Sequence, residues 1–367
     1  MGGKPILNKI GLITKVRNGK TEIRMILDTK QSGVKRITGK SQRVTLPRLF
    51  DAVLHLLFLL AQIVDAPPKG PTRDVVERTR TEEKVGAFVL DFSDAFWQVP
   101  MNLKEQRFFC ATALFSTGKG KNAKRVRKHL AFQRAAQGSA GAPTLWGRLC
   151  GLLMRLTQSM YDPKVQRLMC YVDDPLAALR GTEEERRMNA AIMVLTWSAL
   201  GFGLAFAKGQ LNTEVTWIGG TITAEADGVR AAVKESIIED ILDDLRGFSR
   251  MNLIPEKRLN SLLGKLNHAA GLLIVISPFM EPMWAAFTAK DLIGAPPNTV
   301  WRKQIAPSLH WFEAFFAGKG SHLERFFRAD AYTRSGTTIE IGTDASPWGL
   351  GDGSQWIESS LTHLHAR

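Results

Sequence analysis

The chain has 367 residues and a formal net charge of +14, from 49 Lys and Arg residues against 35 Asp and Glu residues. A hydrophobic content of 44% excludes a wholly disordered or fibrous chain, and the length predicts roughly two to three domains or subdomains. The three cysteines are scattered and match neither a disulfide framework nor the spacing of a zinc site, which favours a reducing compartment.

The sequence shows neither a secretion signal nor a membrane span. The amino-terminal stretch MGGKPILNKIGL lacks the apolar core of a signal peptide. The longest apolar stretch, Ala52–Val64, is interrupted by His55 and Gln62 and is shorter than the ~18 residues that a membrane span needs. We therefore expect a soluble intracellular protein, in the cytoplasm or the nucleus, that does not bind membranes. The sequence leaves its oligomeric state unknown.

The positive charge is concentrated in two segments. Residues 1–50 carry a net charge of +10 and residues 101–136 a net charge of +8, which leaves the remainder at about −4. A surface that only needs to be soluble does not require such segregation. The pattern predicts a polyanionic partner, most simply nucleic acid, with a basic but unspecialised enzyme as the alternative.

The first elements along the chain are predicted to be a hairpin and a helix. Residues 10–15 and 22–28 flank an Asn18-Gly19 turn, and Asn-Gly is a strong hairpin signal. A helical pattern follows over residues 45–64, and its leucines lie nearly all round the helix, which predicts that this helix is buried.

A second hairpin is predicted from the strand-like residues 107–115 and 129–133, around a Gly-rich tip crowded with Lys and Arg. The tip is either solvated or in contact with phosphates, and we favour phosphate contact. Further along, the apolar spacing predicts helices over 143–158, 185–201, 237–245 and 255–266, an irregular segment over 291–335, and a strand and turn over 338–353.

Two apolar, strand-like runs are each interrupted by carboxylates. The only charged residues in VGAFVLDFSDAFWQVPMNL are Asp91 and Asp94, and those in LMCYVDDPLAAL are Asp173 and Asp174. Buried unpaired carboxylates are costly, and their oxygens are the hard ligands that Mg²⁺ binds. Two adjacent strands would bring Asp91 and Asp173 together, and two metal ions about 3.5–4 Å apart would then support phosphoryl transfer. The alternative is that the Asp pair forms a hairpin turn and Asp91 caps a helix.

Six short motifs follow one another along the chain: RMILDTKQSGV (24–34), LDFSDAF (90–96), QGSAGAP (137–143), YVDD (171–174), GFGLAFAKGQ (201–210) and TWIGG (216–220). In this order and spacing they resemble the fingers strand and the motifs A, B, C, D and E of the reverse transcriptases of retroelements. YVDD is the motif C signature typical of that family, and the TWIGG segment resembles its primer grip. The resemblance covers most of the chain.

The resemblance implies an α+β fold, the right-hand polymerase with fingers, palm and thumb, in which an antiparallel palm sheet is backed by helices. The implied domains are residues 1–85 as the N-terminal part of the fingers, 86–106 as palm motif A, 107–136 as a fingers hairpin, 137–222 as palm motifs B to E, 223–290 as the thumb, 291–335 as a connection-like segment and 336–367 as a truncated RNase H-like start.

The resemblance also implies roles for individual residues in catalysis. Asp91 and Asp173 would bind the metal ions, Mg²⁺ or Mn²⁺, with Asp174 beside them and the backbone carbonyl of Phe92 in the metal shell. Lys208 would be the general acid that protonates the leaving pyrophosphate. A solvated lysine near a turn is the alternative interpretation of Lys208.

A second group of residues would contact the nucleotide. Phe96 would sit under the incoming sugar as a steric gate against a 2′-hydroxyl, or else be a core aromatic. Arg24 would contact the triphosphate. Gln137 and Gly138 would line the nucleotide pocket, where a glycine lets the backbone approach the substrate closely. Asp94 would order the motif A turn instead of binding metal.

The remaining assignments concern the primer and the carboxy-terminal end. Trp217 and Gly219 would hold the primer terminus. IEIGTDASPWGLGDG resembles the first strand and turn of an RNase H-like domain, with Asp344 as its first metal carboxylate. That fold needs further carboxylates on later elements, so we expect no RNase H activity and interpret the chain as a fragment of a polyprotein or a decayed element.

Lys35 and Pro175 depart from the family pattern, and proline predicts an edge strand or a bend after the Asp pair.

The expected function is RNA-directed DNA polymerisation, in which deoxynucleoside triphosphates extend a primer on an RNA or DNA template by two-metal-ion phosphoryl transfer. One alternative is an RNA-dependent RNA polymerase, which Phe96 disfavours. Another is a catalytically silent nucleic-acid-binding remnant of a retroelement. The intact carboxylates speak against the remnant, and the incomplete RNase H-like segment speaks for it.

Overall fold

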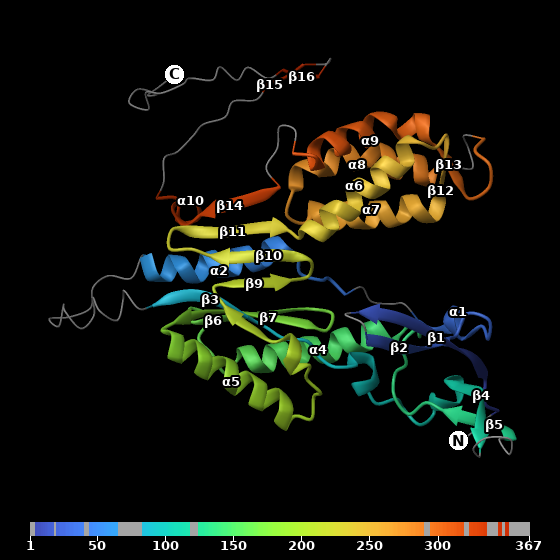
Figure 1. Ribbon diagram of the computed structural model, residues 1–367. Coiled ribbons are helices and arrows are strands. Elements are labelled where there is room, and N and C mark those ends of the chain that lie inside the picture. The colour runs from blue at the N-terminus through green and yellow to red at the C-terminus, as the bar shows by residue number, and fades with distance from the viewer. Residues whose placement is uncertain are drawn as a thin grey trace, which may run out of the picture.

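The computed structural model describes residues 4–17, 20–39, 44–64, 83–117, 124–289, 294–318, 323–335, 344–346 and 349–351. Figure 1 shows a central sheet with helices beneath it, a second sheet above it, a helical bundle at the top and an amino-terminal sheet to the right. None of the described helices is long and apolar enough to cross a membrane.

The central sheet is antiparallel, with the strand order β6-β7-β3-β8. Helix α2 packs on the side of the second sheet, and α4 and α5 pack on the other side (Figure 1). Because both faces are covered, the central strands are nearly continuous apolar runs. The elements are α2 (Leu49–Val64), β3 (Lys84–Val89), α4 (Ala142–Gln158), β6 (Gln166–Tyr171), β7 (Asp174–Gly181), α5 (Glu183–Ala199) and β8 (Gln210–Asn212).

Both basic segments of the chain enter one amino-terminal sheet, with the strand order β2-β1-β4-β5. Strand β1 pairs antiparallel with β2 and parallel with β4, which joins the two predicted hairpins edge to edge. The strands are β1 (Leu7–Arg17), β2 (Lys20–Asp28), β4 (Cys110–Thr117) and β5 (Lys124–Ala131), with the short helices α1 (Val34–Ile37), η1 (Ala95–Gln98) and η2 (Gln106–Phe108) nearby in the chain.

The second sheet has the strand order β14-β11-β10-β9 and shares one large apolar core with α2 and the helical bundle. The bundle helices pack in sequence, α6 on α7, α7 on α8 and α8 on α9, and α9 returns to α6. The elements are η4 (Phe206–Lys208), β9 (Glu214–Trp217), β10 (Gly220–Ala224), β11 (Gly228–Val233), α6 (Glu235–Ser249), β12 (Leu253–Pro255), α7 (Glu256–Ala270), η5 (Ile274–Ile276), α8 (Ser277–Thr288), β13 (Thr299–Trp301), α9 (Arg302–Phe316) and β14 (Glu324–Arg328).

The segment 291–335 is not irregular, as the sequence analysis expected. It contains the 15-residue helix α9 and strand β14. Pro307 lies inside α9 and weakens the helical pattern, but the helix buries Phe312 and Phe316 completely or nearly so. This burial against the other bundle helices compensates for the local cost of proline within a helix.

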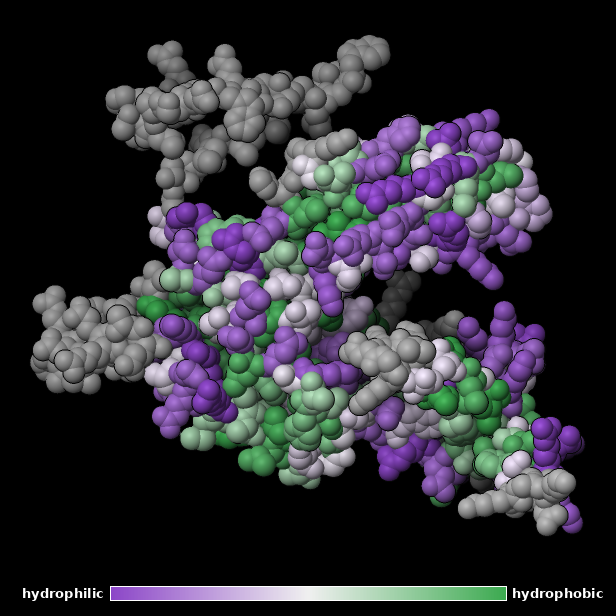
Figure 2. All heavy atoms as spheres, viewed as in Figure 1, coloured by the Kyte–Doolittle hydropathy of each residue, from purple (hydrophilic) through white to green (hydrophobic). Residues whose placement is uncertain are grey.

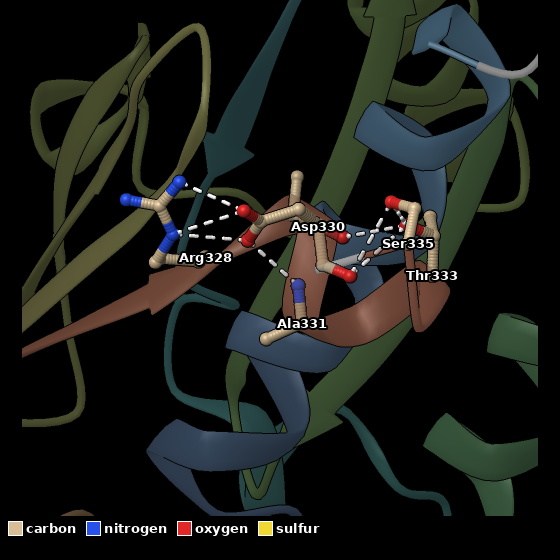
Figure 3. Close-up of polar contacts among 6 residues, drawn as sticks. Arg328, Asp330, Ala331, Thr333 and Ser335 are labelled. Carbon is tan, nitrogen blue, oxygen red and sulfur yellow. Dashed lines mark hydrogen bonds and ion pairs between the residues drawn. The ribbon is translucent and has the colours of Figure 1, made fainter. Parts of the chain in front are cut away.

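A short helix, α10 (Ala329–Thr333), follows β14 and packs against α2. Figure 3 shows how the junction is held: Arg328 Nη2 lies 2.8 Å from Asp330 Oδ2, and Asp330 Oδ1 accepts a hydrogen bond from Ala331 N at 2.7 Å. Ser335 N then donates to Asp330 O at 2.9 Å. Asp330 therefore organises both the start and the end of this helix.

Strand β7 is an interior strand, so the edge strand predicted as one possibility for Pro175 is wrong, and Pro175 instead closely follows the turn at residues 172–173. Pro175 is only the second residue of β7, and its carbonyl still accepts a hydrogen bond from Leu90 N at 3.2 Å. Its partner strand β3 ends at Val89, so the missing N–H falls where the β3–β7 ladder is finishing. The predicted α+β class, with antiparallel sheets backed by helices, is confirmed.

Candidate active site

The Asp pair lies in a tight turn between β6 and β7, which Tyr171 and Asp174 close as the last pair of the ladder. Val172, in the turn, has φ 56°, in the left-handed region. That conformation is unfavourable for a β-branched residue. Neighbouring elements must therefore hold the turn in place.

Two buried tryptophans donate hydrogen bonds to this turn. Trp146 Nε1, from α4, donates to the carbonyl of Val172 at 2.5 Å, and Trp217 Nε1, from β9, donates to the carbonyl of Asp174 at 3.0 Å. The two indoles thus form hydrogen bonds with the backbone carbonyls on either side of Asp173. Trp146 was not predicted from the sequence, although a large aromatic residue on the buried face of the motif B helix was a signal that could have identified it.

Asp91 reaches the same place from β3. It lies two residues beyond the strand and is buried, with 9% of its surface exposed. Phe92 N donates to the carbonyl of Asp173 at 2.8 Å, and Ala205 N donates to the carbonyl of Asp91 at 2.9 Å. The adjacency of β3 and β7 therefore brings Asp91 to the Asp pair, although 82 positions separate it from Asp173.

The carboxylates are close enough to disturb one another. Burial, followed by the charges of Asp173 and Asp91 and a hydrogen bond with Asp91, raises the pKa of Asp174 to about 6. Burial and the charge of Asp91 also raise the pKa of Asp173, against the opposing effects of its own backbone, Lys208 and Arg24. Lys208, at the end of η4, pairs its ammonium group with Asp91 Oδ2.

The donor chemistry of this cluster suits Mg²⁺ or Mn²⁺, because it consists of carboxylate oxygens whose mutual repulsion a cation relieves. Within the described residues, no group of three or more His, Cys, Asp or Glu side chains is already arranged to hold a metal ion. Asp91 and Asp174 share a hydrogen bond, and the Lys208 ammonium group supplies the positive charge beside them. The residues therefore fit a divalent cation by donor type and charge.

The predicted nucleotide-binding residues of motif B contact β2. Gln137 accepts a hydrogen bond from Leu27 N at 2.8 Å through its carbonyl. Gly138 has φ 93°, and a Cβ atom there would lie 2.5 Å from Ile26 Cγ2 and 2.8 Å from the Leu27 carbonyl oxygen. The close approach that requires glycine is therefore an approach to β2.

Arg24, exposed on the same strand, is near enough to Asp173 to lower its pKa.

Motif A contributes side chains to the core and backbone to the site. The Phe92 ring is fully buried, with centroid distances of 5.3 Å to both Trp146 and Trp197. The half-buried ring of Phe96, on η1, packs against the same cluster. Asp94 is exposed, has φ 48°, and accepts a hydrogen bond from Trp97 N at 2.8 Å, so it shapes the turn as expected.

The turn between β9 and β10 lies against the helical bundle. Gly219 has φ 77°, and a Cβ atom there would lie 2.6 Å from Ile237 Cδ1 and 2.8 Å from His268 Nε2. A cavity of about 280 Å³ lies beside it, and Tyr171 and His268 are among its lining residues. Burial lowers the pKa of His268. Trp217 is buried, and its indole N–H points to the Asp turn instead of to solvent. The role of Trp217 and Gly219 in binding the primer stays a prediction.

The described part of the carboxy-terminal segment is a pair of short antiparallel strands, β15 (Asp344–Ser346) and β16 (Gly349–Gly351). The strands agree with the strand predicted in this segment, and the residues between them lie outside the described residues. Asp344 pairs with Gly351 in the ladder. Its metal-binding role and the RNase H-like identity of residues 336–367 remain predictions, and most of that segment lies outside the described residues.

Comparison with known proteins gives a family and a solved structure. Residues 17–222 match the family model described as reverse transcriptase (RNA-dependent DNA polymerase). The solved structures that match include the foamy viral protease-reverse transcriptase in complex with an RNA/DNA hybrid, at 17% identity, 86% coverage of this chain, 34% coverage of that chain and a TM-score of 0.48. The chain thus spans about a third of the length of that protein. No curated protein sequence matches the chain.

Replacing Asp174 by Asn should stabilise the protein above about pH 6 in the presence of a metal chelator. The raised pKa means that ionising Asp174 costs the folded state more than the unfolded state. This penalty is absent below about pH 4, develops as the pH rises to about 6 and is complete above it. We expect the Asp174→Asn melting temperature to exceed that of the wild type by roughly 2–4 °C at pH 7 and by almost nothing at pH 4.

Thermal unfolding followed by circular dichroism from pH 4 to pH 8 measures this difference. Asp243→Asn, which neutralises an exposed carboxylate on α6, is the matched control and should show no such rise with pH. A pH-independent difference between Asp174→Asn and the wild type would refute the repulsive carboxylate cluster.

Proposed function

Since the chain belongs to the reverse transcriptase (RNA-dependent DNA polymerase) family, a family of nucleotidyltransferase enzymes, we propose that it extends a primer 3′-hydroxyl with deoxynucleotides on an RNA or DNA template. The observation that carries the proposal is the convergence of Asp91 with the Asp173-Asp174 turn. Buried like charges are costly, and perturbed carboxyl pKa values cluster at functional sites. A protein that needed only a turn here would have no use for the buried carboxylate of Asp91 beside it.

Asp91 and Asp173 would hold the divalent cations, Mg²⁺ or Mn²⁺, with Asp174 and the carbonyl of Phe92 completing the donor set. The cations would activate the 3′-hydroxyl and neutralise the triphosphate. The contribution of the chain is to hold the carboxylates in place and to set the Lys208 ammonium group beside them. Lys208 favours the ionised form of Asp173, and the two indole hydrogen bonds keep the turn from shifting.

The other proposed roles concern substrate positioning. Arg24 would bind the triphosphate, and its effect on the pKa of Asp173 supports a location near the carboxylates. Lys208 would donate a proton to the departing pyrophosphate. Gln137 and Gly138 would place β2 over the nucleotide, because they attach motif B to that strand.

The primer 3′ end would lie against the turn of Trp217 and Gly219, between the Asp turn and the helical bundle. The central sheet then corresponds to the palm, the amino-terminal sheet to the fingers and α6 to α8 to the thumb. The basic residues of β5, which include Lys124, Arg125 and Lys128, are exposed and would face nucleic acid phosphates.

The first test is primer extension on poly(rA)–oligo(dT) with Mg²⁺ or Mn²⁺. Asp173→Asn should lower the extension rate at least about a hundredfold, because it removes a charged metal ligand without changing the size of the side chain. Template binding, measured by fluorescence anisotropy, should change little. Asp243→Asn should leave both quantities unchanged.

Equal extension by Asp173→Asn and the wild type would overturn the mechanism. A wild type that binds the primed template and never extends it would favour the nucleic-acid-binding remnant.

The second test concerns Phe96, which we propose blocks the 2′-hydroxyl of a ribonucleotide. Phe96→Ala should raise ribonucleotide incorporation relative to deoxynucleotide incorporation by about tenfold or more. Single-nucleotide extension with each nucleotide type measures the ratio. Tyr332→Ala removes an exposed ring on α10 and should not change it. An unchanged ratio in Phe96→Ala would refute the gate, and efficient ribonucleotide use by the wild type would favour an RNA polymerase.

The third test separates the positioning role of Trp146 from its role in the core. Trp146→Phe and Trp197→Phe each remove one buried indole N–H; that of Trp146 binds the Val172 carbonyl, and that of Trp197 binds Thr157 Oγ1 at 2.8 Å. Both should lower the free energy of unfolding by about 1–3 kcal/mol. Only Trp146→Phe should also lower the extension rate, by about tenfold. Similar activity losses in both variants would show that Trp146 acts through core packing alone.

A further inference from the structure

Helix α4 carries four leucines outside its buried side, of which Leu149 is half-buried against the core. Its buried side consists largely of Trp146, Cys150 and Leu153. Leu145, Leu149, Leu152 and Leu156 lie on a different side, spaced four, three and four residues apart, and Leu152 and Leu156 are 57% and 48% exposed. This is the spacing of the apolar seam of a coiled coil, in which each seam residue fits between the side chains of a second helix. We refer to these four leucines as the α4 seam.

Three leucines of the α4 seam, Leu149, Leu152 and Leu156, form one wall of a groove of about 570 Å³. The opposite wall consists of the motif A turn, with Trp97, and of the segment after α5, with Leu200 and Phe202. Arg134 is the one charged residue among the described residues that line the groove. An exposed apolar groove of this kind on a folded domain marks an interaction site more often than a random surface does.

The two parts of the wall opposite α4 are held together by internal hydrogen bonds. Gln98 Nε2 donates to the carbonyl of Gly203 at 3.1 Å, and Gly203 N donates to Gln98 Oε1 at 3.0 Å. Ser93 N donates to the same Gly203 carbonyl at 3.0 Å. These polar groups of the opposite wall thus satisfy one another, which leaves leucine and aromatic side chains to face a ligand. A pre-formed groove also lowers the entropic cost of binding.

The charges beside the α4 seam indicate what kind of helix fits. Arg148 and Arg155 are exposed and lie seven residues apart, on the flank of the seam that faces away from the buried side. Neither has an ion-pair partner among the described residues. Two copies of α4 facing each other would place these arginines in like-charged surroundings, which disfavours self-association. A helix with Asp or Glu beside its apolar seam would pair with them instead.

We propose that the α4 groove is a docking site for an amphipathic α-helix of a separate protein, with leucine-like residues at heptad spacing and acidic residues along their flank. The leucines of the site lie on a different side of α4 from Trp146, which contacts the Asp turn. The role of the site is to recruit the enzyme to a partner. Docking by an apolar helix face with charged flanks is a common mode of peptide recognition.

The test uses the full chain and a fluorescent peptide of roughly three heptads with Leu at the seam positions and Glu at the flanking positions. A second peptide carries Lys in place of Glu. Fluorescence anisotropy should show that the Glu peptide binds at least about tenfold more tightly than the Lys peptide, since each charge pair favours the former. Arg148→Glu combined with Arg155→Glu should reverse this preference.

Leu152→Asp combined with Leu156→Asp should weaken binding of the Glu peptide tenfold or more. Each loss of about 1.4 kcal/mol in binding free energy raises the dissociation constant about tenfold. The matched control is Met188→Asp combined with Ile192→Asp, which changes exposed apolar residues of α5 outside the groove and should bind normally. Figure 2 shows that hydrophobic residues gather over α5 at the lower edge of the molecule, so this control has a comparable apolar setting. Leu152→Ala combined with Leu156→Ala replaces the Asp variant should the latter fail to give a native melting curve.

Four outcomes would overturn the proposal. The first is that neither peptide binds, the second is that the Glu and Lys peptides bind equally, and the third is that the Leu152 and Leu156 changes leave binding intact. The fourth is a wild-type dimer in analytical ultracentrifugation that Leu152→Asp dissociates, which would assign the groove to a second copy of this chain. Primer extension should be unaffected by the groove variants, so a failure here is distinguishable from a failure of the proposed polymerase function.

Discussion

The register between β3 and β7 is the constraint on which the candidate site depends. Pairing of Val89 with Leu176 places the residues after β3 beside the β6–β7 turn, where Phe92 N reaches the carbonyl of Asp173 at 2.8 Å. A shift by one residue would move Asp91 to the opposite face of the sheet. The side chains of β3 oppose such a shift, because Val85 and Val89 pack in one core and Phe88 packs in another, and the shift would exchange them between the two cores. Core packing therefore determines where the charge lies.

The same site is held by elements far apart in the chain. Trp146 of α4 and Trp217 of β9 hold the turn from two sides, and each belongs to a different hydrophobic core. Gly138 and Gly219 extend the arrangement outward, to β2 and to α7, because their missing side chains allow close contact. Glycines that a motif-based interpretation assigns to substrate binding thus also join the separate parts of the structure.

Electrostatics divides the molecule into two regions with different tasks. The two basic segments, with net charges of +10 and +8, meet in one sheet because β1 pairs with β4. The carboxylates gather at the centre, where burial and mutual repulsion raise the pKa values of Asp173 and Asp174. The first arrangement suits a phosphate backbone, and the second suits cations. The separation prevents the basic side chains from neutralising the cluster, apart from Lys208 and Arg24.

The sequence by itself determined the two amino-terminal hairpins, the helices α2, α4, α5, α6 and α7 and the convergence of Asp91 with the Asp pair, because these depend on local periodicity and on motif order. It did not reveal that 291–335 contains a helix, because the stabilising burial of Phe312 and Phe316 is against residues distant in the chain. It misjudged Pro175, whose tolerance depends on where β3 ends. Trp146 as a support of the Asp turn, the attachment of Gly138 to β2 and the α4 groove were decided only by the tertiary structure, since each is a contact between elements that no local pattern encodes.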